Sequence, residues 1–349
     1  MGGNRRHAAQ PVCFLVGLKP HAAQTFNDGR YDESMSFFSV FFALLLEQAH
    51  PLPRNNWVYT GTQGWMAWIR RSMDAGQRHH GLLVWGMAVG VPVLLVAVIH
   101  MLLHSFSIIL TFLWAVGILY VTLGFRQFSH HFTVIRTALE RGDQPAARAA
   151  LAEWQGIALD AVPASDLPRQ AIECAALAVH KHVLGVLVCF MVGWMLGLGP
   201  AGAVLFRLAC YLAETCEPVS ASTVDVLDGR YSSESVWRVT QDAWRWINHV
   251  PARATALAFA VVGNFEEAVA NWRQESEAYP DANDGIVLAA TAGALNLRLR
   301  TAAQSSAVDS SSGYQPQLPH LGSLVGLVWR SVVLWMLILA LVTLARSIG

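Results

Sequence analysis

The chain has 349 residues, of which 14% are charged, and its formal net charge at pH 7 is zero. An average soluble domain carries about 25% charged residues, so this composition points away from an ordinary soluble protein. A neutral chain offers no electrostatic field for nucleic acid, which excludes that class of partner. The five cysteines form no CxxC or CxxxC pair, and this argues against a disulfide framework or a structural zinc site.

The N-terminal segment differs from the rest of the chain. Residues 1–34 are polar, have no apolar period and lack the regions of a signal peptide. An abrupt apolar run begins at Met35. We therefore expect 1–34 to be a disordered tail, either native or upstream of a natural start at Met35. The next segment, Ser36–Gln48, is apolar but only about 13 residues long, which suits a half-span, an interfacial helix or a re-entrant piece.

Three apolar runs are too poor in charge to be helices of a soluble core. They are Leu82–Leu103, Phe106–Leu123 and Leu321–Leu344. Each is close to the ~20 residues that a helix needs to cross a ~30 Å hydrocarbon layer. The first two predict a helical hairpin with His104 and Ser105 at its tip, and the lipid bilayer is the expected partner of all three.

A polar excursion with two helices follows this hairpin. Thr133–Glu140 and Gln144–Trp154 flank a helix-breaking sequence. Gly142 suits the end of the first helix, while Asp143 suits the N-cap and Pro145 the first turn of the second. Two separate helices are therefore expected.

Further along the chain the apolar segments become shorter. Ala171–Leu198 and Ala201–Ala213 predict a second hairpin, broken at Gly199 and Pro200. Val219–Trp246 is polar and predicts another excursion. Pro251 is expected to open a short helix that ends at Val262, because proline is favoured in the first turn.

The C-terminal part divides into a half-helix, a linker and a last span. Gly285–Leu297 is rich in small residues, which suits close helix packing. Residues 301–319 are rich in Ser, Gln and Pro and predict a disordered linker, and residues 320–349 then form a C-terminal transmembrane helix. The expected domains are thus the tail, a membrane domain over 35–300, the linker and this helix.

The distribution of basic residues predicts an orientation. Arginines flank both ends of the first hairpin, whereas its tip has no Lys or Arg. The flanking residues are Arg70, Arg71 and Arg78 before it, and Arg126, Arg136, Arg141, Arg148 and Arg169 after it. By the positive-inside rule both flanks are cytoplasmic. The sequence therefore predicts an all-α fold, a polytopic helical protein of the inner membrane with short half-spanning helices and cytoplasmic helical excursions.

Two charged residues lie in the otherwise apolar second hairpin. Glu173 begins its first helix, with His180 two turns later on the same face, and Arg207 lies in the return limb. Ionisable groups within membrane segments are candidates for function, although both acid and imidazole also suit a solvated interface. Because a lone charge there costs at least ~2.5 kcal/mol, we expect Glu173 and Arg207 to pair or to share a polar cavity.

The remaining candidates are an arginine and an acidic turn. Arg253, just after Pro251, is expected at a helix N-terminus beside a cavity, where it would bind an anion, or else to reach the lipid headgroups. Asp281, Asn283 and Asp284 form a turn that would hold magnesium through oxygen ligands. The alternative for this turn is a plain helix N-cap.

Several local strings resemble the CobD/CbiB family of membrane proteins of cobalamin biosynthesis and its relative AmpE, a membrane modulator of β-lactamase induction. The resemblance covers about residues 35–300 and is most specific at the Pro-Ala-Arg string. The strings are Ala138-Leu-Glu-Arg-Gly-Asp-Gln-Pro-Ala-Ala-Arg148, Gly199-Pro-Ala-Gly-Ala-Val-Leu-Phe-Arg207, Asn248-His-Val-Pro-Ala-Arg253 and Asp281-Ala-Asn-Asp-Gly285, with Glu173 at the start of its helix.

The resemblance implies an ATP-dependent ligase that joins adenosylcobyric acid, a corrinoid, to an aminopropanol unit or its phosphate. It implies Mg-ATP as co-substrate and roles for four residues around a carboxylate or phosphate. These are Glu173 and Arg207 in catalysis and Arg253 and Asn283 in substrate or phosphate binding, with Asp281 and Asp284 as metal ligands.

The chain also departs from the family pattern at acidic positions. The family's Glu-Asn after the first Glu is Leu177-Ala178 here, and its paired Asp before the Pro-Ala-Arg string is Trp244-Arg245. Magnesium-ATP chemistry needs carboxylates to hold the metal. A non-catalytic, signalling role like that of AmpE, without a cofactor, is therefore the alternative to a ligase.

Overall fold

The computed structural model describes residues 21–50, 57–73, 78–157, 159, 162–218, 231–276, 279–300 and 313–348. Nearly all of these residues are helical, which confirms the predicted all-α class. The helices are α1 (His21–Ala49), α2 (Trp57–Met73), α3 (Arg78–Trp85), α4 (Val91–Phe106), α5 (Ile108–Thr122), α6 (Phe125–Glu140), α7 (Gln144–Gln155), α8 (Leu167–Val179), α9 (Gly185–Met195), α10 (Ala201–Thr215), α11 (Glu234–Val262), α12 (Phe265–Glu275), α13 (Ala282–Leu295) and α14 (Leu318–Ile348).

Short irregular elements connect some of these helices. A π-helical turn, η1 (Gly86–Gly90), joins α3 to α4, and another, η3 (His180–Leu184), joins α8 to α9. A 3₁₀ turn, η2 (Ala164–Asp166), precedes α8. Within the described residues the only strands are β1 (Glu217–Pro218) and β2 (Tyr231–Ser232), which pair in parallel. Because each strand has two residues, the pair does not change the fold class.

Within the described residues, three helical stretches are long and apolar enough to cross a membrane: His80–Phe106, Ala164–Met195 and Leu318–Ala345. The first and third confirm two of the predicted spans. The predicted span Phe106–Leu123 is corrected, because its helix α5 has 15 residues and rises only about 22 Å. The middle stretch contains most of Ala171–Leu198, the predicted first limb of the second hairpin. Within it, η3 continues the helix from α8 into α9 without a break.

The outer surfaces of α4, α5 and α14 are apolar, as expected for contact with lipid. Large hydrophobic side chains are exposed along α4, α5 and α14, where a water-facing helix would carry polar residues. They include Leu94, Leu95, Val98, Met101 and Leu102 of α4, Ile109, Leu110 and Leu113 of α5, and Val333, Leu337 and Leu341 of α14. The bilayer is therefore the environment that this surface fits.

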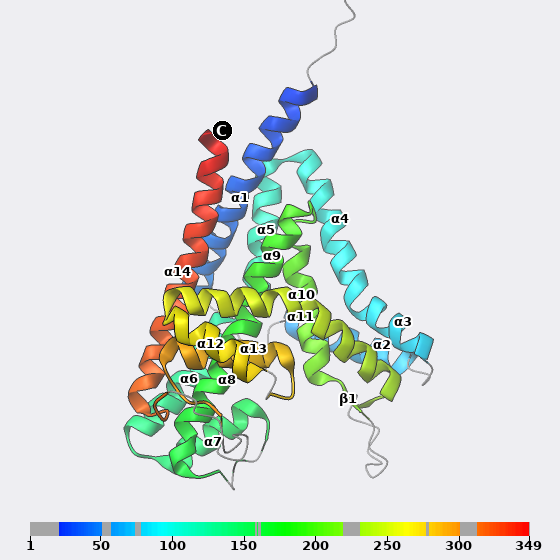
Figure 1. Ribbon diagram of the computed structural model, residues 1–349. Helices are drawn as coiled ribbons and strands as arrows, with labels where there is room; N and C mark the ends of the chain where they lie inside the picture. The colour runs from blue at the N-terminus through cyan, green and yellow to red at the C-terminus, as the bar shows by residue number, and fades with distance from the viewer. Residues whose placement is uncertain are drawn as a thin grey trace, which may run out of the picture.

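The helices form two regions separated by α11 (Figure 1). On one side α1, α4, α5, α9 and the C-terminal part of α14 rise together, and α1 packs against both α5 and α14. On the other side lie α6, α7, α8, α12 and α13, so that α8 and α9 connect the two regions. Residues on η3 thus lie close to the boundary between the apolar bundle and the polar region.

The second hairpin is packed closely at its turn. The structure ends α9 at Met195 and begins α10 at Ala201, which confirms the break predicted at Gly199 and Pro200. Gly197 and Gly199 adopt positive φ angles of 74° and 57°, a conformation that glycine takes without strain. Gly202 lies against the carbonyl of Cys189, where any added Cβ would overlap it. The small residue lets α9 and α10 approach closely.

Residues 234–246 of the predicted polar segment and the short helix predicted around Pro251 are instead one helix, while residues 219–230 lie outside the described residues. The 29-residue α11 begins after Ser233, whose hydroxyl accepts a hydrogen bond from the Val236 N–H, and Pro251 lies inside it. An internal proline loses a backbone hydrogen bond and crowds the preceding turn. Pro251 and the following Ala252 are buried, and this packing keeps the helix continuous. The prediction that Pro251 opens a helix was therefore wrong.

Both segments that were expected to be disordered, 1–34 and 301–319, contain residues with defined secondary structure. The helix α1 begins at His21 and runs past the boundary expected at residue 34, while residues 1–20 lie outside the described residues. For the linker, 301–312 lies outside the described residues, but Tyr314 pairs with Leu297 and α14 begins at Leu318. Backbone hydrogen bonds link Tyr314 to Asn296 and Arg298, so the expected disorder over 313–319 is corrected.

Candidate functional site

A cavity of about 900 Å³ lies where the polar region meets the apolar bundle. Its walls come from α8, η3, the second half of α10 and the end of α7, with one residue each from α2 and α13. Four of the side chains that line it are acidic or strongly basic: Glu173, Lys181, Arg207 and Glu214. Two acids and two bases in one cavity provide the kind of polar site that binds and orients a charged substrate.

Glu173 enters this cavity from α8, with its side chain 22% exposed. Arg169 Nη1 donates a hydrogen bond to Glu173 Oε1 at 2.7 Å, and Arg169 Nη2 lies 3.4 Å from an oxygen of Asp166. The predicted sharing of a cavity by Glu173 and Arg207 is confirmed. Direct pairing between them is not found, because Arg169, one turn earlier, takes that place.

Arg207 is a charged residue of the cavity whose guanidinium can still bind a ligand. Its side chain is half-buried, and within the described residues no hydrogen bond or ion pair is assigned to it. Arg207, Tyr211 and Glu214 follow one another at helical spacing on α10, so that all three face the cavity. A guanidinium in this position can form two parallel hydrogen bonds to a carboxylate or a phosphate.

Lys181, which the sequence analysis did not select, connects three elements at the cavity wall. Its Nζ lies 3.4 Å from Glu214 Oε1 of α10 and 3.5 Å from Asp284 Oδ2 of α13. The second oxygen of Asp284, Oδ1, is buried without a hydrogen-bond partner in the described residues. Burial raises the pKa of Asp284 above its usual range, and the charge of Lys181 opposes that rise.

His180 is held outside the cavity, although the sequence placed it on the same face as Glu173. It is fully buried, with Nδ1 2.9 Å from Thr255 Oγ1 and Nε2 2.7 Å from Asn248 Oδ1 of α11. The cavity face of this long helix is centred on Cys174, Ala178 and Lys181. Glu173 reaches the cavity from the edge of that face, whereas His180 falls just beyond it and ties η3 to α11.

Arg253 and Asn283 form a contact between α11 and α13, away from the lining of the large cavity. Arg253 Nη1 donates to the carbonyl of His249 at 2.9 Å and to Asn283 Oδ1 at 3.3 Å. Asn283 Nδ2 donates to the carbonyl of Arg245 at 3.0 Å. The predicted helix N-terminus at Arg253 is absent because α11 continues through this position. A phosphate-binding role for the pair remains a prediction.

Asp281 performs the N-cap role that was the alternative to metal binding. Its Oδ1 accepts hydrogen bonds from the backbone N–H of Asn283 at 2.8 Å and of Asp284 at 3.0 Å. In the part of the chain that the structure describes, no group of three or more His, Cys, Asp or Glu side chains gathers as a metal site. Of the two predicted metal ligands, Asp281 uses Oδ1 for the cap, whereas Asp284 has a buried oxygen, Oδ1, without a hydrogen-bond partner in the described residues.

Replacing Asp281 with alanine tests this N-cap. We expect Asp281→Ala to lose about 1 kcal/mol of stability, a fall of roughly 2 °C in the thermal unfolding midpoint. Asp281→Asn keeps a capping oxygen and should unfold like the unmodified chain. Thermal unfolding with and without Mg²⁺ measures both effects. A metal-ligand role would instead predict that the asparagine variant loses its response to Mg²⁺.

Comparison with known proteins gives one family. The sequence model of a family described as CobD/Cbib protein matches residues 40–214. The matched residues include Glu173, Lys181, Arg207 and Glu214, the acidic and basic residues of the cavity. The match therefore covers the helices that build the candidate site.

Individual relatives agree with this family match. The cobalamin biosynthesis protein CobD of Stutzerimonas stutzeri is 29% identical over 328 residues, which cover 87% of this chain and 96% of that protein. The protein of the same name in Chromobacterium violaceum is 29% identical over 228 residues, covering 63% and 67%. That of Mycobacterium tuberculosis is 46% identical over 59 residues, covering 16% and 19%. No solved structure matches the chain.

Proposed function

Because the chain belongs to the CobD/CbiB family, we propose that it acts in cobalamin biosynthesis as a membrane-bound amide ligase. Its substrates are adenosylcobyric acid, ATP, and aminopropanol or aminopropanol phosphate. The reaction site is the cavity that contains Glu173, Lys181 and Arg207. The bilayer-facing helices hold this cavity at the edge of the membrane, on the side of the polar helices.

The observation that carries this proposal is the guanidinium of Arg207, which lies in a large polar cavity and has no assigned partner within the described residues. Adenosylcobyric acid carries a carboxylate, and ATP and aminopropanol phosphate carry phosphate. An arginine without a protein partner keeps its donors for such a group. The volume of about 900 Å³ lies within the usual range for ligand pockets. The cavity therefore suits the carboxylate- or phosphate-bearing part of these substrates better than a purely structural role.

The cavity residues can be assigned to the two steps of amide formation. In the first step an oxygen of the corrinoid carboxylate bonds to the γ-phosphorus of ATP, and ADP leaves with the electron pair of the broken P–O bond. In the second step the amine nitrogen bonds to the acyl carbon, and inorganic phosphate leaves. Arg207 neutralises charge on the transferring phosphoryl group, and Glu173 accepts the proton that the amine loses.

Magnesium fits this cavity in part. Glu214, which is 46% exposed, lines the cavity, and it shares Lys181 with Asp284, which does not line it. Asp284 Oδ1 is buried without a hydrogen-bond partner in the described residues. These two carboxylates would hold Mg²⁺, which is commonly bound by one or two carboxylates together with substrate phosphates. When bound, the ion would supply positive charge that balances the ATP phosphates. Asp281 is less suited, because it does not line the cavity and its Oδ1 accepts two backbone hydrogen bonds.

The proposed location is the inner membrane, with the cavity open to the cytoplasm. The polar helices α6, α7 and α8 carry Arg136, Arg148 and Arg169. The positive-inside rule assigns such basic segments to the cytoplasmic side. ATP and the corrinoid would then reach the cavity without crossing the bilayer.

The experiment uses the full chain purified in detergent. Adenosylcobyric acid, aminopropanol or its phosphate, and Mg-ATP are added, and mass spectrometry follows the amide product together with ADP. We expect product with one of the two amines, and none when ATP or Mg²⁺ is omitted. Absence of product from folded protein with either amine would overturn the ligase proposal.

A further inference from the structure

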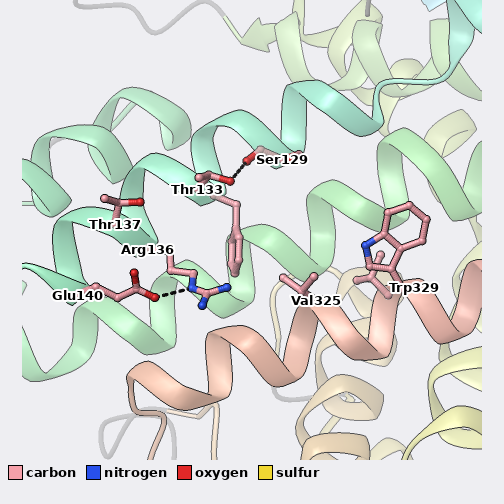
Figure 2. A pocket seen from close by; sticks show the side chains of 9 residues that line it. Ser129, Thr133, Arg136, Thr137, Glu140, Val325 and Trp329 are labelled. Carbon is pink, nitrogen blue, oxygen red and sulfur yellow. Dashed lines mark hydrogen bonds and ion pairs between the residues drawn. The ribbon is translucent and has the colours of Figure 1, made fainter. Parts of the chain in front are cut away.

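A second cavity, of about 250 Å³, lies between α6 and the first part of α14 (Figure 2). The wall from α6 is largely polar and includes Ser129, Arg136 and Glu140, whereas α14 contributes Val325 and Trp329. None of these residues lines the large cavity. The pocket is thus a separate site with one polar wall and one apolar wall.

The arginine of this pocket, Arg136, uses one of its five N–H donors in an ion pair. Arg136 Nε donates to Glu140 Oε1 at 2.7 Å, one turn along α6. The two Nη groups have no assigned partner within the described residues, and Figure 2 shows the guanidinium end directed toward α14. Glu140 therefore orients the guanidinium so that its outer edge faces the cavity. Two parallel donors at that edge match the oxygens of a phosphate.

The pocket lies at the level where α14 begins to face lipid. Exposed apolar side chains repeat every four residues from Trp329, which is 44% exposed, through Val333 and Leu337 to Leu341. From Trp329 to Ile348 the helix rises about 28 Å, close to the ~30 Å thickness of the hydrocarbon layer. Tryptophan is enriched at the boundary between lipid and water. Trp329 therefore places the pocket at the headgroup level.

We propose that this pocket binds the headgroup of a zwitterionic aminophospholipid such as phosphatidylethanolamine. The phosphate lies on the free edge of Arg136, the ammonium group lies on Glu140, and the acyl chains follow the exposed apolar stripe of α14. The neutral Arg136–Glu140 pair matches a headgroup that carries one charge of each sign. A purely anionic headgroup would meet the Glu140 carboxylate, and a choline group has no N–H to donate to it.

The size of the pocket agrees with this occupant. At about 30 Å³ for each water-sized group, the cavity of about 250 Å³ holds roughly eight such groups. A phosphoethanolamine group has about that many non-hydrogen atoms. The hydroxyl of Thr137, which also lines the pocket and has no assigned hydrogen bond in the described residues, provides a further donor at the same wall.

Native mass spectrometry of the full chain in detergent tests this proposal. Phosphatidylethanolamine, phosphatidylcholine and phosphatidylglycerol are added at equal concentration, and retained adducts are compared. We expect phosphatidylethanolamine to be retained most strongly. Soluble phosphoethanolamine, without acyl chains, should not compete at the same concentration. Equal retention of all three lipids, or equal binding of the soluble compound, would overturn the proposal.

Three variants identify the residues involved. Arg136→Ala should reduce retention of phosphatidylethanolamine about tenfold, because a charge-assisted contact is lost. Glu140→Gln should abolish the preference over phosphatidylcholine. Arg238→Ala is the matched control, since Arg238 forms the same one-turn ion pair with Glu234 on an exposed face of α11, and it should change nothing. Unchanged retention in both Arg136→Ala and Glu140→Gln would contradict the assignment.

Discussion

Replacing Arg207 with alanine is expected to lower kcat/KM for amide formation at least about a hundredfold, with little change in stability. The loss follows from removal of the charge that stabilises the transferring phosphoryl group. Stability should be retained because, within the described residues, no protein group pairs with Arg207. Arg207→Lys keeps the charge but loses the bidentate geometry, so its kcat/KM should lie between those of the alanine variant and the unmodified chain.

Two comparisons separate a catalytic role of Arg207 from a structural one. Arg253→Ala removes the hydrogen bond to Asn283 that connects α11 with α13, so it should lower the unfolding midpoint more than Arg207→Ala does. Arg238→Ala removes an exposed charge outside the cavity and should leave both activity and unfolding unchanged. Full activity of Arg207→Ala, measured in the same ligation assay, would refute the assignment of Arg207.

Local features of the sequence were sufficient to predict much of the fold. The low charge and long apolar runs predicted the spans that contain α4 and α14. Gly142, Asp143 and Pro145 predicted the boundary between α6 and α7, where the Asp143 side chain accepts a hydrogen bond from Ala146 N–H. Such signals depend on neighbours within a few residues, so they can be read without knowledge of the tertiary structure.

The errors came from features that tertiary packing decides. Proline favours a first turn in isolation, but buried contacts around Pro251 keep it inside α11. The alternative that Glu173 and His180 lie solvated at an interface fails for His180, which is fully buried and contacts Asn248 and Thr255 of α11. Because these two partners are distant from His180 in sequence, only tertiary packing brings them together.

The residues of the candidate site were also predicted only in part. Glu173 and Arg207 were found because each is a charge in an apolar segment, and both line the cavity. The Arg169–Glu173 contact could have been predicted from its spacing of one helical turn. The position of Lys181 between Glu214 and Asp284 could not, because these residues are distant in sequence and meet only when α10 and α13 pack beside η3.

Replacing Lys181 with methionine is expected to give the largest loss of stability among the cavity residues. Methionine fills similar space without the charge, so Asp284, with its side chain only 21% exposed, loses its cation. Leaving a buried charge without its partner costs about 3–5 kcal/mol. Since Glu214 is 46% exposed and water screens part of the interaction, we expect a loss of roughly 2 kcal/mol.

The loss should depend on pH in a defined direction. Asp284 lies at the start of α13, outside the three candidate spans, and Lys181 opposes the rise in its pKa that burial causes. Without Lys181 the pKa of Asp284 in the folded protein rises further above its unfolded value. The folded state then binds more protons than the unfolded state, so stability falls as pH rises between those two values. The variant should therefore be closer to the unmodified chain at pH 5 than at pH 8.

A second substitution decides whether the unpaired carboxylate causes this loss. Asp284→Asn introduced into the Lys181→Met variant removes the buried charge, and it should restore most of the stability and abolish the pH dependence. Thermal unfolding of the single and double variants at pH 5 and pH 8 gives the four midpoints needed. If the double variant unfolds as early as Lys181→Met at pH 8, the loss comes from altered packing at η3, and the ion pair with Asp284 does not stabilise the fold.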